Sequence, residues 1–175
     1  MPDLAVREAE PGDLPAIQAI YAHHVTHGLG SFEETPPSLD EMIRRRRAIA
    51  DAGLPYLVCV AGGAVAGFAY AGLYRPRPAY RYSVEDSVYV APASVRRGCG
   101  RRLLSALIDR CAALGYRQML AVIGDRDNHG STGLHRGLGF REVGHLPAVG
   151  FKHGRWVDVV VMQRALGDGD RNKPG

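Results

Sequence analysis

The chain has 175 residues, of which 46% are hydrophobic and 23% are charged, and its formal net charge at pH 7 is +4. This balance excludes a disordered or collagen-like chain and is typical of one globular domain. No apolar run approaches the roughly 18 residues of a membrane span, and the N-terminus "MPDLAVREAEPGDL" lacks the basic and then apolar pattern of a secretory signal.

The three cysteines Cys59, Cys99 and Cys111 are odd in number and lack the spacing of a metal or disulfide site. We therefore expect them to pack as small hydrophobic side chains, in a soluble, cytoplasmic protein that does not bind membranes. We expect a single domain over residues 1–167. Residues 167–175 read "GDGDRNKPG", and we expect the polar segment 168–175 to be a disordered tail.

Hydrophobic periodicity and glycine positions predict the secondary structure in chain order. Ser38, with Glu41 three residues later, is a capping box at a helix start. Gly62-Gly63 between two apolar runs is a hairpin turn. The predicted elements are a strand at 5–8, a helix from 13 to 25, a helix at 38–53, strands at 56–61, 64–74 and 85–92, a helix at 101–114, a strand at 117–124, a helix at 128–139 and two strands within 141–166 around "KHGR".

This order predicts an α/β fold in which helices cover both faces of one mixed sheet. The two strands that flank the helix at 101–114 supply the parallel pair, because a strand–helix–strand connection of this length is a parallel crossover. The four successive arginines of the second helix point in different directions around its axis, and we expect them on a solvated surface.

The segment "VRRGCGRR", residues 95–102, combines two glycines and four arginines at the start of a helix. A helix N-terminus offers unpaired backbone N–H groups and the positive end of the helix dipole. Gly98 and Gly100 would let the main chain approach an anion closely. The chemistry favours a phosphate cradle, although a structural strand-to-helix turn is the alternative. A nucleic-acid grip is disfavoured because no stacking aromatics are interleaved with the arginines.

Two motifs then resemble a known family. "VRRGCG" followed by "RRLLSALIDRCAALGY" resembles the acetyl-CoA pyrophosphate loop and helix of the GCN5-related N-acetyltransferases, with Val95 where the family usually has Gln or Arg. "NHGSTGLHRGLGF" is similar to the family's N-x-x-[SA]-x-x-L-[YH]-x-x-x-G-F segment. "AYAGLYRPRPAYRYSVEDSVYVAP" and "VGFKHGRWVDVVVMQ" resemble the phosphinothricin and methionine-sulfoximine N-acetyltransferases, and the likeness runs from Val6 to Leu166.

The resemblance implies the fold of that family, with a mostly antiparallel sheet and two splayed parallel strands. It implies direct transfer of an acetyl group from acetyl-CoA to the α-amine of phosphinothricin, methionine sulfoximine or methionine sulfone, in a ternary complex and by a homodimer. The alternatives are an acetyltransferase for another amine, such as a peptide N-terminus or a polyamine, and a CoA-binding sensor without turnover. No metal is expected, since no carboxylate completes a site with the histidines at 23, 24 and 27.

The resemblance also implies two catalytic residues. Glu85 stands where the subfamily has a glutamate assigned as general base, acting directly or through water. His135 stands where many acetyltransferases have a tyrosine that protonates the CoA thiolate. An imidazole, with its ordinary pKa of about 6.5, could be that acid or a second base.

The remaining site residues follow by position in the same motifs. Backbone groups of the strand around Tyr89 should meet the pantetheine arm, and Asn128 should hydrogen-bond it as well as cap its helix. An amino-acid substrate needs a cation for its carboxylate, which an arginine supplies best. The chain is one residue longer than its relatives between Ile123 and Asn128. The cofactor set is Val88, Tyr89, Val90, Arg96, Arg97, Gly98, Cys99, Gly100, Arg101, Asn128 and Ser131, and the substrate set is Phe32, Arg75, Arg77, Tyr80, Arg81, Asp86 and Ser87.

Overall fold

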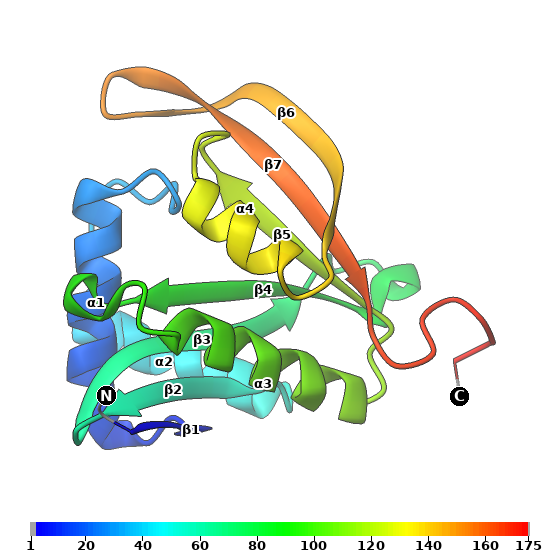
Figure 1. Ribbon diagram of the computed structural model, residues 1–175, viewed down its shortest axis with the longest axis horizontal. Coiled ribbons are helices and arrows are strands. Elements are labelled where there is room, and N and C mark those ends of the chain that lie inside the picture. Colours follow the sequence, from blue (N-terminus) through cyan, green and yellow to red (C-terminus); the bar gives the residue numbers. More distant parts are fainter. Residues whose placement is uncertain (1–2, 175) are drawn as a thin grey trace.

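The computed structural model describes residues 3–174, over which seven strands form one sheet in the order β1-β2-β3-β4-β5-β7-β6 (Figure 1). The sheet is antiparallel except between β4 and β5, which are parallel as the sequence predicts. The strands are β1 (Leu4–Glu8), β2 (Tyr56–Ala61), β3 (Ala64–Leu73), β4 (Ser83–Val90), β5 (Gln118–Gly124), β6 (Arg141–Lys152) and β7 (Arg155–Ala165). The helices are α1 (Leu14–His27), α2 (Leu39–Asp51), α3 (Cys99–Ala113) and α4 (His129–Arg136), with short 3-10 turns at Pro11–Asp13, Pro78–Tyr80 and Pro92–Ser94.

Helices cover both faces of the sheet, which confirms the predicted layering (Figure 1). On one face α1 and α2 pack against β2 and β3, around fully buried residues such as Ile17, Val25 and Phe68. On the other face α3 packs against β1 to β4, around Leu103 and Leu107. The apolar faces of both helical layers are therefore buried against one central sheet.

Local signals explain where the helices begin. The Ser38 hydroxyl accepts a hydrogen bond from the Glu41 N–H at 3.2 Å, so one half of the predicted capping box is present, while the Glu41 carboxylate accepts from Arg44 and Arg45 instead of closing the box. Such a cap contributes about 1 kcal/mol. Helix α3 begins at Cys99, two residues before the expected start, because Gly98 has φ +87° and turns the chain directly into the helix. Helix α4 ends at Arg136 rather than Gly139, since the next residues leave the helix in hydrogen-bonded turns.

Strands β4 and β5 pair over only three positions, and the last of them joins Glu85 to Leu120. Beyond that position β4 continues to Val90 and β5 continues to Gly124 without pairing to each other. Strand β5 is held on its other side by β7 over its whole length. The sheet is therefore open between two parallel strands.

The last two strands form a long hairpin, as "KHGR" predicts. The turn residues His153 and Gly154 both have positive φ, 50° and 72°, as a two-residue turn of the I′ type requires. An irregularity between Leu146 and Gly150 displaces β6 relative to β7, and the arm crosses above the open end of β4 and β5 (Figure 1).

The C-terminal segment returns to the body of the protein. Arg117 Nη1 donates to the Gly169 carbonyl at 3.2 Å and to Asn172 Oδ1 at 2.9 Å. The disorder expected of residues 168–175 stays a prediction. Within residues 3–174, no helix has both the length and the apolar character to cross a membrane.

Candidate active site

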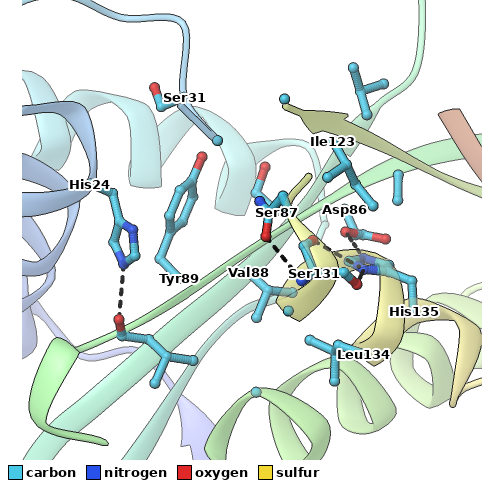
Figure 2. Close-up of a pocket in the computed structure, with 18 of the residues that line it drawn as sticks. His24, Ser31, Asp86, Ser87, Val88, Tyr89, Ile123, Ser131, Leu134 and His135 are labelled. Atoms are coloured by element: carbon cyan, nitrogen blue, oxygen red, sulfur yellow. Dashed lines mark hydrogen bonds and ion pairs between the residues drawn. The ribbon is translucent and has the colours of Figure 1, made fainter. Parts of the chain in front are cut away.

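A cavity of about 900 Å³ opens where β4 and β5 separate. Its walls come from the end of α1 and the following loop, the second half of β4, the N-terminus of α3, the end of β5 and the start of α4 (Figure 2). The splayed strands thus create a cavity through the sheet, so that residues from both faces of β4 line it.

Glu85 occupies the position where the two strands part, and it lines the cavity. Burial raises the pKa of the Glu85 carboxyl, the neighbouring Asp86 raises it further and Arg75 opposes the shift. Among the described residues it has no hydrogen-bond partner. A carboxylate without a fixed donor and with a raised pKa is free to accept a proton from a bound molecule.

Asp86 follows on the opposite face of β4 and contacts His135 of α4 (Figure 2). Asp86 Oδ1 lies 3.0 Å from His135 Nε2, and the two side chains are 3% and 4% exposed. The second carboxyl oxygen, Oδ2, is buried without a partner among the described residues. Burial raises the pKa of Asp86, while for His135 the bond and charge of Asp86 outweigh burial and raise the imidazole pKa.

Hydrogen-bond partners determine where the protons of this pair reside. His135 Nδ1 lies 2.7 Å from the Ser131 carbonyl oxygen, which only accepts, so Nδ1 carries a proton. Between Nε2 and Asp86 Oδ1 there is one further proton, bound to either atom. In both arrangements neither ring nitrogen has a free lone pair, so His135 cannot act as a base towards substrate while these bonds hold.

The glycine loop forms the N-terminal end of α3 at one end of the cavity. Gly98 adopts a left-handed conformation, and a Cβ at Gly100 would lie 3.4 Å from side-chain atoms of Leu134 and Val90. Arg101 and Arg102 donate to the carbonyls of Gly137 and Leu4, at 3.4 and 2.7 Å. A helix N-terminus with glycines and nearby arginines suits a pyrophosphate.

Ten of the eleven predicted cofactor residues line this cavity, and only Arg97 does not. Arg96 and Arg97 are both exposed and have no partner among the described residues. Asn128 caps α4 as predicted, because its Oδ1 accepts from the Ser131 N–H at 3.1 Å. Val95, at the unusual first position of the motif, also lines the cavity and is 54% exposed.

Of the predicted substrate residues, Phe32, Asp86 and Ser87 line the cavity. The arginine-rich loop before β4 lies outside the lining. There the Arg75 guanidinium lies 5.1 Å from the centre of the Tyr74 ring, and Tyr74 contacts Tyr80 edge-on. Arg77, Tyr80 and Arg81 of the same loop are exposed. The charge of Arg75 lowers the pKa of Glu85, and this effect is smaller than those of burial and of Asp86, which raise it.

Apart from Phe32, sequence reasoning missed the wall made by α1 and the loop after it. Tyr21, His24, Ser31 and Glu33 all line the cavity. His24 Nε2 donates to the Val90 carbonyl at 2.9 Å, and burial lowers the pKa of His24, which keeps it neutral. In the sequence, Tyr21 and His24 share the helical spacing of the apolar residues of α1. This was the only signal for these two residues, and it indicated packing in the core rather than a place in the site.

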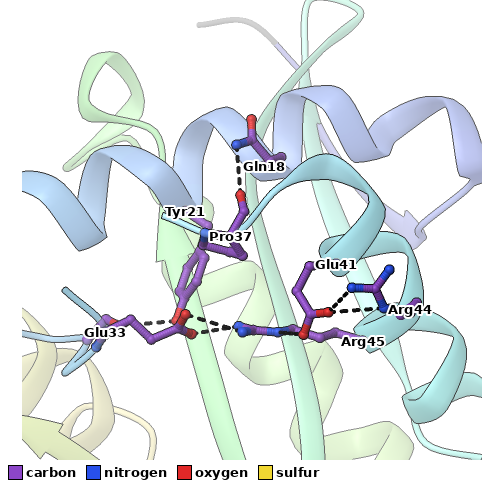
Figure 3. A network of polar contacts seen from close by, with 8 residues as sticks. Gln18, Tyr21, Glu33, Pro37, Glu41, Arg44 and Arg45 are labelled. Carbon is purple, nitrogen blue, oxygen red and sulfur yellow. Dashed lines mark hydrogen bonds and ion pairs between the residues drawn. The ribbon is translucent and has the colours of Figure 1, made fainter. Parts of the chain in front are cut away.

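Polar contacts fix that loop to both helices of its layer (Figure 3). Glu33 accepts two hydrogen bonds from Arg45, at 2.6 and 3.2 Å, and one from Tyr21 at 2.6 Å. Gln18 donates to the Pro37 carbonyl at 3.1 Å. The arginines of α2 do diverge as predicted. Arg45 and Arg46 are not solvated as expected, however, because Arg45 donates to Glu33 and Arg46 donates to the Ala9 carbonyl.

In the part of the chain that the structure describes, no three His, Cys, Asp or Glu side chains are placed to hold a metal ion. His23 and His27 stack on each other at 4.6 Å between ring centres. The three cysteines are buried thiols, as predicted.

Comparisons with known proteins agree with this geometry. Residues 17–140 match the acetyltransferase (GNAT) family. The chain is 53% identical over 169 residues to a phosphinothricin N-acetyltransferase of Alcaligenes faecalis, covering 97% of this chain and 86% of that protein. It is 39% identical over 163 residues to an L-methionine sulfoximine/L-methionine sulfone acetyltransferase of Salmonella typhimurium, covering 93% and 95%. The crystal structure of a phosphinothricin acetyltransferase from Sinorhizobium meliloti in complex with acetyl-CoA matches with a TM-score of 0.95 at 48% identity, over 98% of this chain and 93% of that one.

Proposed function

We propose that this chain, which belongs to the acetyltransferase (GNAT) family and is an acetyl-CoA-dependent acyltransferase, acetylates the α-amine of phosphinothricin, methionine sulfoximine or methionine sulfone. The names of its relatives support these substrates. The observation that carries the proposal is the cavity between β4 and β5, with Glu85 where the strands part and the N-terminus of α3 at another wall.

The glycine loop would hold the pyrophosphate of acetyl-CoA. Gly98 and Gly100 would keep the main chain accessible, and the first N–H groups of α3, which have no partner within the helix, would bind an anion. Arg96 would meet a CoA phosphate. The unpaired edge of β4, from Ser87 to Val90, would donate and accept hydrogen bonds along the pantetheine arm.

Glu85 would act as the base, directly or through one water. The amine nitrogen forms a bond to the acetyl carbon, the carbon–sulfur bond breaks, and the proton lost by the amine passes to Glu85. Burial supports this role, because a carboxylate with a raised pKa is a stronger base than an exposed one.

His135 would supply the proton that the departing thiolate needs. Its Nδ1–H lies 3.4 Å from the Ser131 hydroxyl oxygen, and Ser131 lines the cavity. We place the Ser131 hydroxyl between the two groups: its proton goes to sulfur, and the Nδ1 proton replaces it. Asp86 would position His135 through Nε2 rather than contact the substrate.

The acceptor would be recognised by its carboxylate and its side chain. Arg75 is the cation whose charge acts on Glu85, so it is suited to bind an α-carboxylate next to the reacting amine. Phe32 and Ser87 line the cavity and would contact the remainder of the acceptor.

The β6–β7 arm supports the proposed homodimer. Phe151 and Trp156 are 56% and 66% exposed, and their rings contact each other edge-on at 5.2 Å. Val143, Leu146 and Val149 extend this exposed apolar surface along an edge strand, and such a surface is typical of an interface. The buried thiols suit a reducing cytoplasm, where acetylation would protect the cell from the analogues.

The test is release of CoA thiol by the purified chain, measured with phosphinothricin, methionine sulfoximine, methionine sulfone, a polyamine and a peptide with a free N-terminus. The proposal expects turnover with the three amino-acid analogues and little with the other two amines. Preferential turnover of the polyamine or the peptide would assign a different acceptor. Binding of acetyl-CoA without turnover of any amine would indicate a sensor.

A further inference from the structure

Lys152 is an unusual residue in this chain. Of its 22 lysines and arginines only Lys152 and Lys173 are lysine, and Lys152 is 2% exposed. Its Nζ donates to the Ser31 carbonyl at 2.6 Å, across 121 residues of sequence. No described residue forms a salt bridge with it within 4.0 Å. A buried ammonium whose one hydrogen bond goes to a backbone carbonyl is costly, and burial lowers the pKa of Lys152 although the charges of Glu34 and Glu33 oppose that shift.

The carbonyl that Lys152 binds belongs to the wall of the cavity. Ser31 lines the cavity, and so does Phe32, which is the next residue in the chain. The Phe32 ring packs against two glycines from strands that lie on either side of β7. A Cβ added at Gly150 of β6 would lie 2.3 Å from Phe32 Cε2, and one added at Gly124 of β5 would lie 3.0 Å from Cε1.

Lys152 and Gly150 therefore act on the same loop from the same strand. Residues two apart in a strand face the same side, and here Gly150 meets Phe32 while Lys152 meets Ser31. Phe151 between them faces outward and is exposed. Lys152 itself does not line the cavity. An arginine would place a bulkier guanidinium in the same buried space.

We propose that Lys152 is a positioning residue for the acceptor: its bond to Ser31 sets the place of Phe32 in the cavity wall and thereby the fit of the amino-acid substrate. The inference rests on the proposed function, since it takes the Phe32 wall as the acceptor side. The acetyl-CoA side, at the α3 N-terminus, has no contact with Lys152. Substitution of Lys152 should therefore affect the two substrates unequally.

The test compares wild type with Lys152→Met, which keeps an unbranched side chain one atom shorter and removes its donor, and with Lys173→Met as the matched removal of a lysine. Methionine sulfoximine and acetyl-CoA are varied separately. Lys152→Met should raise KM for methionine sulfoximine about tenfold, the loss of one charge-assisted hydrogen bond, and leave KM for acetyl-CoA within about twofold. Lys173→Met should have the KM values of wild type. Lys152→Arg, which keeps a donor, should have a KM for methionine sulfoximine between those of wild type and Lys152→Met.

A second readout separates positioning from simple loss of structure. In a Phe32→Ala background, Lys152→Met should change KM for methionine sulfoximine much less than in wild type, because the group it positions is gone. Equal KM changes for both substrates, wild-type KM values for Lys152→Met, or its failure to fold where Lys173→Met folds would each overturn the inference. Inactivity of wild type and Lys173→Met would overturn the proposed function itself, and the inference with it.

Discussion

Asp86 Oδ1 and His135 Nε2 lie 3.0 Å apart inside the protein, and the opposite ring nitrogen of His135 faces the Ser131 carbonyl at 2.7 Å. One proton is shared between the carboxyl group and the ring, and a second is held by Nδ1. The pair therefore fixes both the orientation and the tautomer of His135.

Removal of either partner should destabilise the protein. Asp86→Ala leaves Nε2 without its partner, and His135→Ala leaves a buried carboxyl with none, so we expect each to lower the free energy of unfolding by about 3 kcal/mol. The double variant should lose clearly less than the sum, because the two losses share one interaction. Urea unfolding of the four proteins measures the coupling. Strictly additive losses would show that the two side chains do not interact.

Glu85 should reduce stability while it supports activity. Its folded-state pKa is raised above the ordinary 4.5, so the folded state binds a proton more readily than the unfolded chain. Stability linked to this group is thus greatest below the unfolded pKa and is lost as pH rises through the folded pKa. Glu85→Gln should raise Tm at pH 8, and the gain should shrink as pH falls towards 4. Thermal unfolding across this range measures it, and a lower Tm at pH 8 would contradict the burial argument.

Arg96 and Arg97 should differ in their effect on the cofactor. Arg96 lines the cavity and Arg97 does not, so Arg96→Ala should raise KM for acetyl-CoA about tenfold, as expected for loss of one charged phosphate contact. Arg97→Ala should have a smaller effect. Repeating the assay with acetyl-dephospho-CoA, which lacks the 3′-phosphate, identifies the phosphate that Arg96 contacts. If Arg96 contacts the 3′-phosphate, wild type and Arg96→Ala should have the same KM for this substrate. Equal KM values for acetyl-CoA in the two variants would contradict the distinction.

Gly124 should be intolerant of any side chain. A Cβ there would lie 2.2 Å from the Leu29 carbonyl oxygen and 3.0 Å from the Phe32 ring. Gly124→Ala should cost about 1–3 kcal/mol through overpacking and should raise KM for the acceptor. Gly72→Ala is the matched strand control, since a Cβ at that position meets nothing within 4 Å. Equal free energies of unfolding for Gly124→Ala and Gly72→Ala, measured in urea, would show that the cavity wall adjusts to the added methyl group at no cost.

The order of elements could be predicted from sequence because it depends on local signals. Ser38 with Glu41, Gly62-Gly63 and the glycine loop each specify a cap or a turn within a few residues. The site could be predicted only in part, because its contacts join distant segments. Asp86 and His135 are 49 residues apart, and Lys152 and Ser31 are 121 apart. No periodicity relates such pairs, and only the packing of α4 and of the loop after α1 against the strands brings them together.

Glu85, where β4 and β5 part, is the group that we propose accepts the proton of an amine acetylated within the cavity. The direct measurement is kcat/KM for N-acetylation of methionine sulfoximine by wild type and Glu85→Gln, with the product identified by mass spectrometry and acetyl-CoA binding checked by thermal shift. We expect Glu85→Gln to bind acetyl-CoA as wild type does and to lose about 10²- to 10⁴-fold in kcat/KM. Full activity of Glu85→Gln, or no N-acetylated product from wild type, would contradict the account.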